Sequence, residues 1–211
     1  MRVLIFSGHP DDEILWFWPV LQGANHEVAV LAACRNAHKG AGPEWALKNV
    51  CAVNWAEYLG CVLEHNQFYR QPTRYIAPTL MDVVVQLRTA IQRAIDTFKP
   101  DAIFTHNPWG EYGHGDHRLC FEIASRFELP LLLTDMCQPN RCHPSADVIP
   151  AFYRRVFAED EVVQAARLDE AWYEKMKGIY EKANAWTWGG HEPVREAGLY
   201  LFPMKTCPES A

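Results

Sequence analysis

VLIFSGHPDDE, residues 3–13, is the stretch of sequence that decides the fold of this chain. Its first four residues form a continuous apolar run rich in β-formers, which is typical of a strand buried on both faces of a parallel sheet. One imidazole and two carboxylates follow this strand directly, from His9, Asp11 and Asp12. Since ligands of α/β proteins bind beyond the carboxyl ends of parallel strands, we expect these side chains at the functional edge of the sheet.

A second polar cluster repeats this arrangement further along the chain. HNPWGEYGHGDH, residues 106–117, follows the apolar run 102–105 and contributes His114, Asp116 and His117. Both clusters lie immediately after a predicted strand, so we expect both to open onto the same edge of the sheet.

The rest of the chain alternates between strand-like and helix-like segments. We expect further strands at 27–31, 131–134 and 152–157, helices at 19–24, 44–59, 79–98, 117–127 and 161–183, and a long loop over 137–150. Apolar strands that alternate with helices indicate an α/β protein whose mostly parallel sheet is covered on both faces. We expect a single domain over 1–211, with a core of about residues 1–135 and a C-terminal helix and tail, about 151–211, packed onto it.

Composition excludes several classes of protein. The chain has 211 residues, of which 49% are hydrophobic and 22% charged, as in ordinary globular proteins. A net charge of −6 with scattered basic residues gives no reason to expect nucleic acid as a partner. No apolar stretch approaches the roughly 20 residues of a membrane span, and the N-terminal apolar run is too short for a signal peptide. Seven cysteines without close pairs fit a reduced compartment, so we expect a cytoplasmic protein.

Together the two clusters suit a divalent metal with mixed nitrogen and oxygen ligands and a spare carboxylate. A hydrolytic zinc usually takes three protein ligands and leaves a position for water. His9 and Asp12 are three residues apart, and His117 can supply the third ligand from the neighbouring strand. Asp11 then stands beside a ligand and can accept a proton from the water as general base. Zn²⁺ is the expected cofactor, and Fe²⁺ or another divalent metal would also suit these ligands.

His114, Asp116 and Tyr112 are further catalytic candidates. A histidine near the metal can hydrogen-bond a developing oxyanion or protonate a leaving amine if a carboxylate keeps it charged, and Asp116 is the natural partner of His114. Tyr112 could donate another hydrogen bond. Simpler explanations stand beside these roles, because an Asp-Asp pair after a strand is often a helix N-cap and a loop tyrosine often only packs.

HPDDE at residues 9–13, with Tyr112-x-His114-x-Asp116-His117 downstream, resembles the PIG-L/LmbE-like family of zinc-dependent deacetylases. The similarity covers about residues 1–135 and implies a Rossmann-like three-layer αβα sandwich. The family includes de-N-acetylases of glucosaminyl-inositols, of thiol precursors and of sugar-bearing antibiotic intermediates. The resemblance implies metal ligation by His9, Asp12 and His117, general base catalysis by Asp11, oxyanion stabilisation by His114, orientation of that histidine by Asp116, and a mobile tyrosine at Tyr112.

The substrate-contacting segments depart from the family pattern. Trp16 and Trp18 stand where the family has small, glycine-rich residues, and Arg35 belongs to a loop that lacks the family's glycine-rich sequence. Trp188 lies in WTWGGH, residues 186–191, whose tryptophans could stack on a sugar ring. We therefore take these four residues as candidates for substrate binding. The same tryptophans could instead anchor the C-terminal segment or a subunit contact, and a homo-oligomer is compatible with the sequence.

These features favour a zinc-dependent amidohydrolase that removes an N-acyl group, above all N-acetyl, from an amino sugar or related small molecule. The partner would then be a small N-acylated substrate. One alternative is metal-dependent hydrolysis of a glycosidic or phosphoester bond in a nucleotide-like substrate. Another is a non-catalytic nucleotide-binding module, which the absence of G-x-G-x-x-G after the first strand disfavours.

Overall fold

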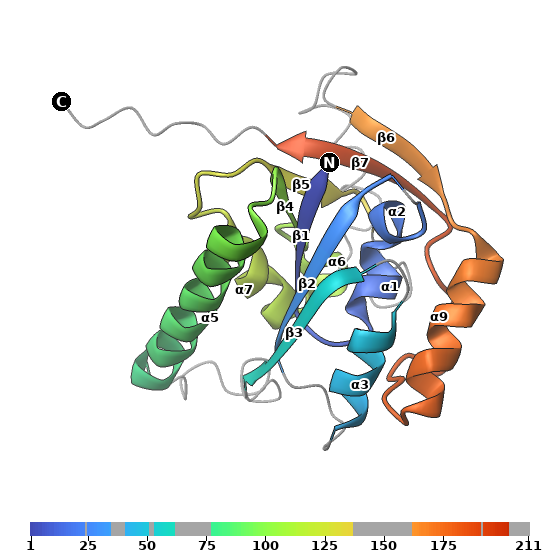
Figure 1. Ribbon diagram of the computed structural model, residues 1–211, viewed down its shortest axis with the longest axis horizontal. Coiled ribbons are helices and arrows are strands. Elements are labelled where there is room, and N and C mark those ends of the chain that lie inside the picture. The colour runs from blue at the N-terminus through green and yellow to red at the C-terminus, as the bar shows by residue number, and fades with distance from the viewer. Residues whose placement is uncertain are drawn as a thin grey trace.

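The computed structural model describes residues 1–23, 25–34, 41–50, 53–61, 77–136, 162–190 and 192–202. Within these ranges one seven-stranded sheet runs through the molecule in the order β3-β2-β1-β4-β5-β7-β6 (Figure 1). The strands are β1 (Arg2–Ser7), β2 (Glu27–Cys34), β3 (Val53–Cys61), β4 (Ala102–Thr105), β5 (Leu131–Thr134), β6 (Val162–Arg167) and β7 (Glu196–Phe202).

The first five strands of this sheet are parallel, and the last two are not. β1 lies between β2 and β4, β3 pairs with β2, and β5 pairs with β4, all in parallel. β7 runs antiparallel to both β5 and β6. The order β3-β2-β1-β4-β5 is that of a doubly wound α/β sheet. The predicted α/β fold with a mostly parallel sheet is therefore confirmed.

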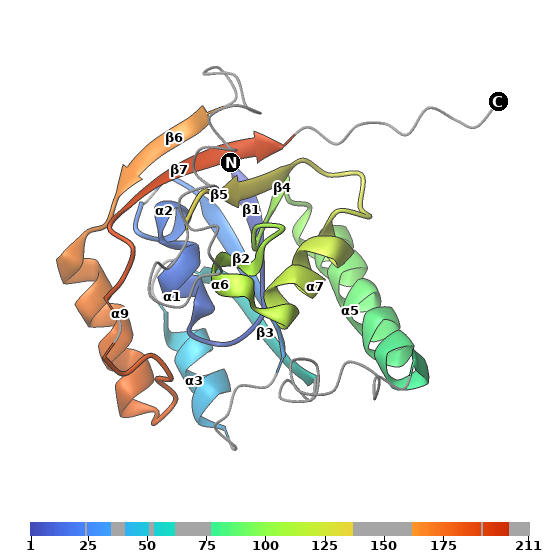
Figure 2. The ribbon, with the colours of Figure 1, turned by 180° about the vertical axis from the view of Figure 1, so that it is seen from behind.

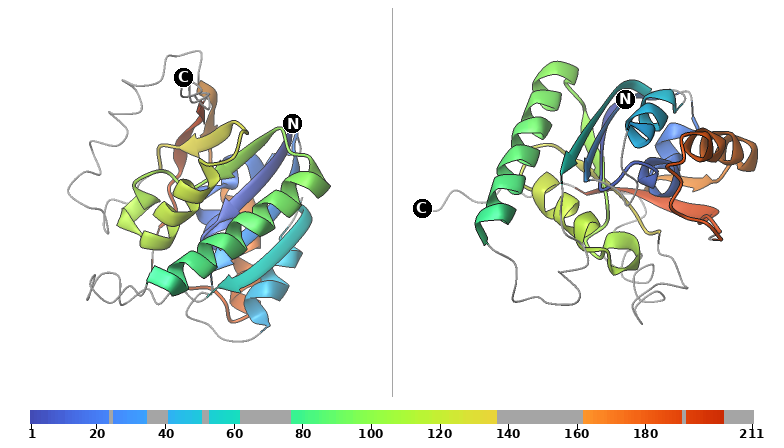
Figure 3. Two further views of the ribbon diagram at one scale, coloured as in Figure 1. Left: turned by 90° about the vertical axis from the view of Figure 1, so that its left-hand side faces the viewer. Right: turned by 90° about the horizontal axis from the view of Figure 1, so that it is seen from below.

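Helices cover both faces of the sheet and make three layers. The helices are α1 (Asp12–Trp16), α2 (Trp18–Leu21), α3 (Gly42–Asn49), α5 (Ala77–Phe98), α6 (Gly110–Gly113), α7 (Gly115–Ala124) and α9 (Glu170–Lys182). α5 and α7 lie on one face, and α1, α2, α3 and α9 lie on the other (Figures 2 and 3). None of the helices in the described ranges is both long and apolar enough to cross a bilayer.

The apolar run of β1 is explained by its central place between the two helical layers. Leu4 and Phe6 pack into the core beneath α5 and α7, whereas Val3 and Ile5 pack into the core beneath α1 and α2. All four side chains are fully buried. A strand with a core on each side has no polar face, which is why its sequence is apolar without alternation.

The predicted helix over 44–59 is wrong in its second half. α3 ends at Asn49, and residues 53–61 form β3 instead. This segment carries Val53, Trp55 and Tyr58, whose branched or aromatic side chains suit a strand, and the parallel ladder with β2 satisfies its backbone groups. The helical spacing of its apolar residues was a weaker signal than this pairing.

The C-terminal part differs from expectation in a similar way. The predicted helix over 161–183 is replaced by β6 and then α9, because the Asp169 carboxylate accepts hydrogen bonds from the backbone N–H groups of Ala171 and Trp172 and caps the helix there. β7 was not predicted at all. The expected strand 152–157 and loop 137–150 lie outside the described residues.

The contact between α3 and α9 gives a test of the packing. A Cβ atom at Gly42 would lie 2.3 Å from the backbone carbonyl oxygen of Ala183, whereas one at Gly178 in α9 would meet nothing within 4 Å. We expect Gly42→Ala to lower the free energy of unfolding by about 1–3 kcal/mol through overpacking. Gly178→Ala should raise it by about 0.5–1 kcal/mol, because alanine is the better helix former. Urea unfolding of both variants checks this, and equal stability of Gly42→Ala and the parent would refute the packing.

Candidate metal centre and active site

The turn after β1 brings the first polar cluster into a confined space. A Cβ atom at Gly8 would lie 2.9 Å from Cδ2 of His117, so only glycine allows this close approach. Asp11 adopts a left-handed backbone conformation with φ of 96°. Its backbone N–H donates to Oε2 of Glu13 at 3.0 Å, which holds the turn in this conformation. α1 begins at the next residue.

The second polar cluster is held in shape by Asn107, directly after β4. Its Oδ1 accepts hydrogen bonds from the backbone N–H groups of Trp109 and Glu111, at 3.0 and 3.2 Å. Its Nδ2 donates to the carbonyl oxygen of Met136, beyond β5, at 3.0 Å. This amide therefore ties the loop before α7 to the neighbouring strand. The loop and the first turn of α7 carry Tyr112, His114, Asp116 and His117.

The two clusters meet at the carboxylate of Asp12. Its Oδ2 lies 3.1 Å from Nε2 of His117 and 3.2 Å from Nδ1 of His9. All three side chains are buried. Ligand atoms around a tetrahedral zinc with bonds of 2.0–2.1 Å stand about 3.3 Å apart. These separations are close to that spacing, so the three predicted ligands lie together at the carboxyl edge of the sheet.

The hydrogen bond on the far side of the His117 ring prepares this residue for a metal. Its Nδ1 lies 2.7 Å from Oε2 of Glu111, and a carboxylate there can only accept, so the proton is on Nδ1. Nε2 then directs a lone pair toward the Asp12 carboxylate and makes no hydrogen bond within the described structure. Either a bound cation or a second proton on the imidazole would stabilise these two buried groups. The arrangement fits a metal, with Glu111 as the partner that orients the ligand.

His106 lies close enough to Asp12 and His117 to be an alternative metal ligand, but both of its ring nitrogens already have hydrogen-bond partners. Candidate ligand atoms cluster in two sets that share His117, one with His9 and His114 and one with Asp12 and His106. The backbone N–H of Gly8 donates to Nε2 of His106 at 2.8 Å, and Nδ1 of His106 lies 2.9 Å from Oε2 of Glu111. The His106 ring also stacks on His117, with centroids 3.7 Å apart. We therefore assign His106 to supporting His117.

His9 is placed between two carboxylates. Its Nδ1 faces Asp12, and its Nε2 lies 3.0 Å from Oδ2 of Asp116. Burial by itself would lower the pKa of His9, but hydrogen bonds to Asp116 and Asp12 outweigh it and raise the pKa to about 10. Asp116 thus contacts the predicted ligand His9. Its expected partnership with His114 stays a prediction.

His114 lies against both histidines predicted as ligands, on the more accessible side of the cluster. Its ring centroid is 5.0 Å from that of His9 and 4.4 Å from that of His117. His9 and His114 are each 8% exposed, whereas His117 is fully buried. A substrate would therefore approach from the side of His9 and His114. The Tyr112 ring borders the same side, 5.2 Å from His114.

Asp11 occupies the N-cap position of α1, but its side chain does not cap the helix. Its Oδ2 instead accepts hydrogen bonds from Oγ1 and the backbone N–H of Thr187, at 2.6 and 3.1 Å. Burial and the adjacent charge of Asp12 raise the pKa of Asp11 well above its ordinary value. A buried carboxylate with a raised pKa beside a ligand has the properties of a general base, which a helix cap does not need.

Of the four residues predicted to bind substrate, the structure describes the three tryptophans. The Trp16 ring packs edge-on against Trp188, with centroids 5.7 Å apart, and lies beside Tyr112. Trp18 is fully buried in the core beneath α1 and α2, and Trp16 and Trp188 belong to the same core, with 2% and 5% of their surface exposed. All three tryptophans therefore have a packing role, and their expected contact with substrate stays a prediction. Arg35 lies outside the described residues.

Three important residues escaped the sequence interpretation. His106 and Glu111 belong to the second cluster, and their position directly after β4 and before His117 was a usable signal. Thr187 follows α9, far along the chain from Asp11, and no local pattern connects the two.

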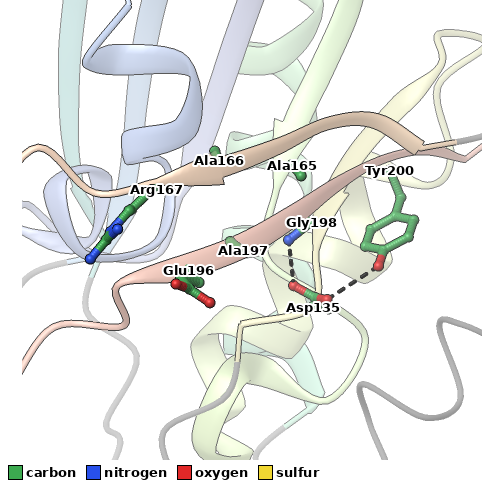
Figure 4. A pocket seen from close by; sticks show the side chains of 8 residues that line it. All are labelled: Asp135, Ala165, Ala166, Arg167, Glu196, Ala197, Gly198 and Tyr200. Carbon is green, nitrogen blue, oxygen red and sulfur yellow. Dashed lines mark hydrogen bonds between the residues drawn. The ribbon is translucent and has the colours of Figure 1, made fainter.

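A separate open groove of about 480 Å³ lies over β6 and β7 (Figure 4). None of the predicted site residues lines it. Within it the Asp135 carboxylate accepts hydrogen bonds from the backbone N–H of Gly198 and from the hydroxyl of Tyr200, at 2.8 and 3.2 Å. We assign no function to this groove.

Comparison with known proteins identifies a family and a shared fold. Residues 4–127 match the protein family PIG-L, described as GlcNAc-PI de-N-acetylase. A deacetylase from the teicoplanin biosynthesis pathway, solved as its bog complex, is 16% identical with a TM-score of 0.56, over 98% of this chain and 100% of that chain. The A40926 pseudoaglycone deacetylase is also 16% identical, with a TM-score of 0.52, over 96% of this chain and 98% of that chain. At this identity the likeness shows a shared fold. No curated protein matches the chain.

Removal of a ligand tests the assignment of the metal centre. We expect Asp12→Ala and His117→Ala each to deplete bound metal, because two remaining protein ligands leave the site underfilled. His26→Ala is the control, since this histidine lies before β2 and away from the cluster. Elemental analysis of the purified variants measures the effect. Full metal occupancy in either ligand variant would remove that residue from the ligand set.

Proposed function

The chain belongs to the PIG-L family of GlcNAc-PI de-N-acetylases, and from this premise we propose that it is a metal-dependent hydrolase of N-acyl amides. The substrate would be an amino sugar or related small molecule that carries an N-acetyl group. The observation that carries the proposal is the position of Asp11, a buried carboxylate with a raised pKa directly beside Asp12, whose Oδ2 lies close to Nδ1 of His9 and Nε2 of His117.

His9, Asp12 and His117 would hold the cation, with Glu111 behind His117 and Asp116 behind His9. Zn²⁺ is the metal we propose, and Fe²⁺ suits the same donors. When bound, such a cation supplies a Lewis acid that polarises the amide carbonyl and acidifies the attacking water.

Asp11 would accept the proton of the attacking water. Its Oδ2 is occupied by the two hydrogen bonds from Thr187, and among the described residues no hydrogen bond reaches its Oδ1. Oδ1 is therefore the oxygen left to take the proton. Burial and the neighbouring charge of Asp12 raise the pKa of Asp11 above its ordinary value, which strengthens this carboxylate as a proton acceptor. The same carboxyl group can then return the proton to the departing amine.

His114 would donate a hydrogen bond to the oxyanion that develops at the carbonyl. It lies beside both histidine ligands and on the accessible side of the cluster, where the acyl group must approach. Such donors act mainly on the tetrahedral transition state. Tyr112 borders the same approach and could contact either the acyl group or the sugar.

A cluster of aromatic side chains lies next to the site. Trp16, Tyr112 and Trp188 contact one another with ring centroids between 5.2 and 6.1 Å apart, and Trp16 and Tyr112 also contact His117. Trp16 and Trp188 are only 2% and 5% exposed, so of these three side chains Tyr112, which is partly exposed, is the one that could pack against the apolar face of a sugar. The similar structures are a deacetylase of teicoplanin biosynthesis and the A40926 pseudoaglycone deacetylase, which is consistent with deacetylation of a small-molecule conjugate.

Release of acetate tests the proposal directly. The purified protein is incubated with a panel of N-acetylglucosamine conjugates, and acetate and free amine are quantified. We expect release that a chelator abolishes and that added Zn²⁺ or Fe²⁺ restores. Release that persists at full rate after chelation would contradict metal dependence, and release of a different group would contradict deacetylation.

The variant Asp11→Asn tests whether Asp11 acts as the general base and not as a metal ligand. The amide side chain has the same shape but cannot accept the proton, so turnover should fall about 10²- to 10⁴-fold. Metal content should stay at the level of the parent, because Asp11 is not a ligand. Steady-state kinetics together with elemental analysis checks both parts. A variant with near-normal kcat would rule out Asp11 as the base.

His114→Ala should lower kcat while it changes KM little. Loss of one oxyanion donor costs about 10²- to 10³-fold in rate. If the hydrogen bond formed in the ground state, KM would rise and kcat would stay the same. Steady-state kinetics on one substrate distinguishes the two, and a pure KM effect would refute the proposed role.

A further inference from the structure

We infer that Thr187 is a positioning residue that fixes the carboxylate of Asp11 for catalysis; this rests on the proposed function. Thr187 follows α9 and precedes β7, so it lies outside residues 4–127, over which the chain matches its family. The segment that carries it would thereby complete an active site whose other parts come from the first two thirds of the chain.

Two hydrogen bonds from one residue hold one oxygen of Asp11. Oγ1 of Thr187 donates to Oδ2 at 2.6 Å, and the backbone N–H of Thr187 donates to the same atom at 3.1 Å. Rotation about the last side-chain bond of an aspartate is soft, because its energy wells are broad and roughly two-fold. With Oδ2 held by two donors, this rotation is blocked and Oδ1 keeps a single direction.

Asp11 needs this support because its own turn does not provide it. Its φ of 96° is rarely adopted by residues with a side chain, and its carboxylate makes no bond to the N-terminus of α1. Its backbone N–H is held by Glu13, whose other carboxylate oxygen accepts a hydrogen bond from the hydroxyl of Tyr180 in α9. The backbone and the side chain of Asp11 are thus both anchored, directly or through Glu13, to the C-terminal part of the chain.

Thr187 is itself held firmly enough to position another group. Ala185, two residues before it, is fully buried and donates its backbone N–H to the carbonyl oxygen of Tyr180 at 2.9 Å. Trp188, the next residue, packs against Trp16 and Tyr112. These contacts lock the backbone on both sides of Thr187.

The test compares Thr187→Val with Thr187→Ser in the metal-loaded protein. Valine keeps the shape and removes the hydroxyl, and serine keeps the hydroxyl and removes the methyl group. We expect Thr187→Val to lower kcat about 10- to 100-fold, because misplacement of a catalytic group is costly, with KM and metal content unchanged. Thr187→Ser should keep kcat within about 3-fold of the parent, since the oriented hydrogen bond remains.

Thr89→Val is the matched control, because the Thr89 hydroxyl donates only to the carbonyl oxygen of Val85 within α5. Its kcat should equal that of the parent. Normal kcat in Thr187→Val, equal losses in the valine and serine variants, or a change confined to KM would each overturn the inference. If Thr187→Val does not fold in a thermal melt, Thr187→Ala takes its place with the same expected loss. Absence of acetate release by the parent protein would instead refute the proposed function.

Discussion

The parallel pairing of β1 with β4 is the constraint on which the site depends. In this register Phe6 lies opposite Thr105, so the chain leaves the sheet at the same level from both strands. The two polar clusters that follow must therefore meet, and Gly8 lets them approach closely enough for Asp12 to contact His117. A shift of one residue between these strands would turn every β1 side chain to the opposite face and separate the clusters. The fold and the chemistry thus depend on the same hydrogen-bonded ladder.

The site concentrates negative charge that the protein must compensate. Five carboxylates, those of Asp11, Asp12, Glu13, Glu111 and Asp116, are buried around it. Buried carboxylates without partners would cost several kcal/mol each. Imidazoles, Thr187 and Tyr180 supply hydrogen bonds to them, but the lone pair of His117 still faces the carboxylate of Asp12. The proposed cation would complete this balance and would give a physical reason for so many buried acidic groups at one edge of the sheet.

The sequence predicted the elements whose signal is local. β1, β4 and β5 are short apolar runs, and α5 has clear helical periodicity that Pro100 ends. β3, β6 and β7 were missed or taken for helices, because their identity depends on partners that are distant in the chain. The site divides in the same way: His9, Asp12 and His117 stand in motifs directly after strands, whereas Thr187 reaches Asp11 only in the folded molecule. Trp18 is the opposite case. Its position near the first motif predicted a place in the substrate pocket, whereas its side chain lies in the core.

The most direct test of this interpretation is a crystal structure of the metal-loaded protein with the metal located by anomalous scattering. We predict one metal bound by His9, Asp12 and His117, with Nε2 of His106 still bonded to the backbone N–H of Gly8 and Nδ1 of His117 bonded to Glu111. A metal coordinated by His106, or by His9, His114 and His117 without Asp12, would contradict it.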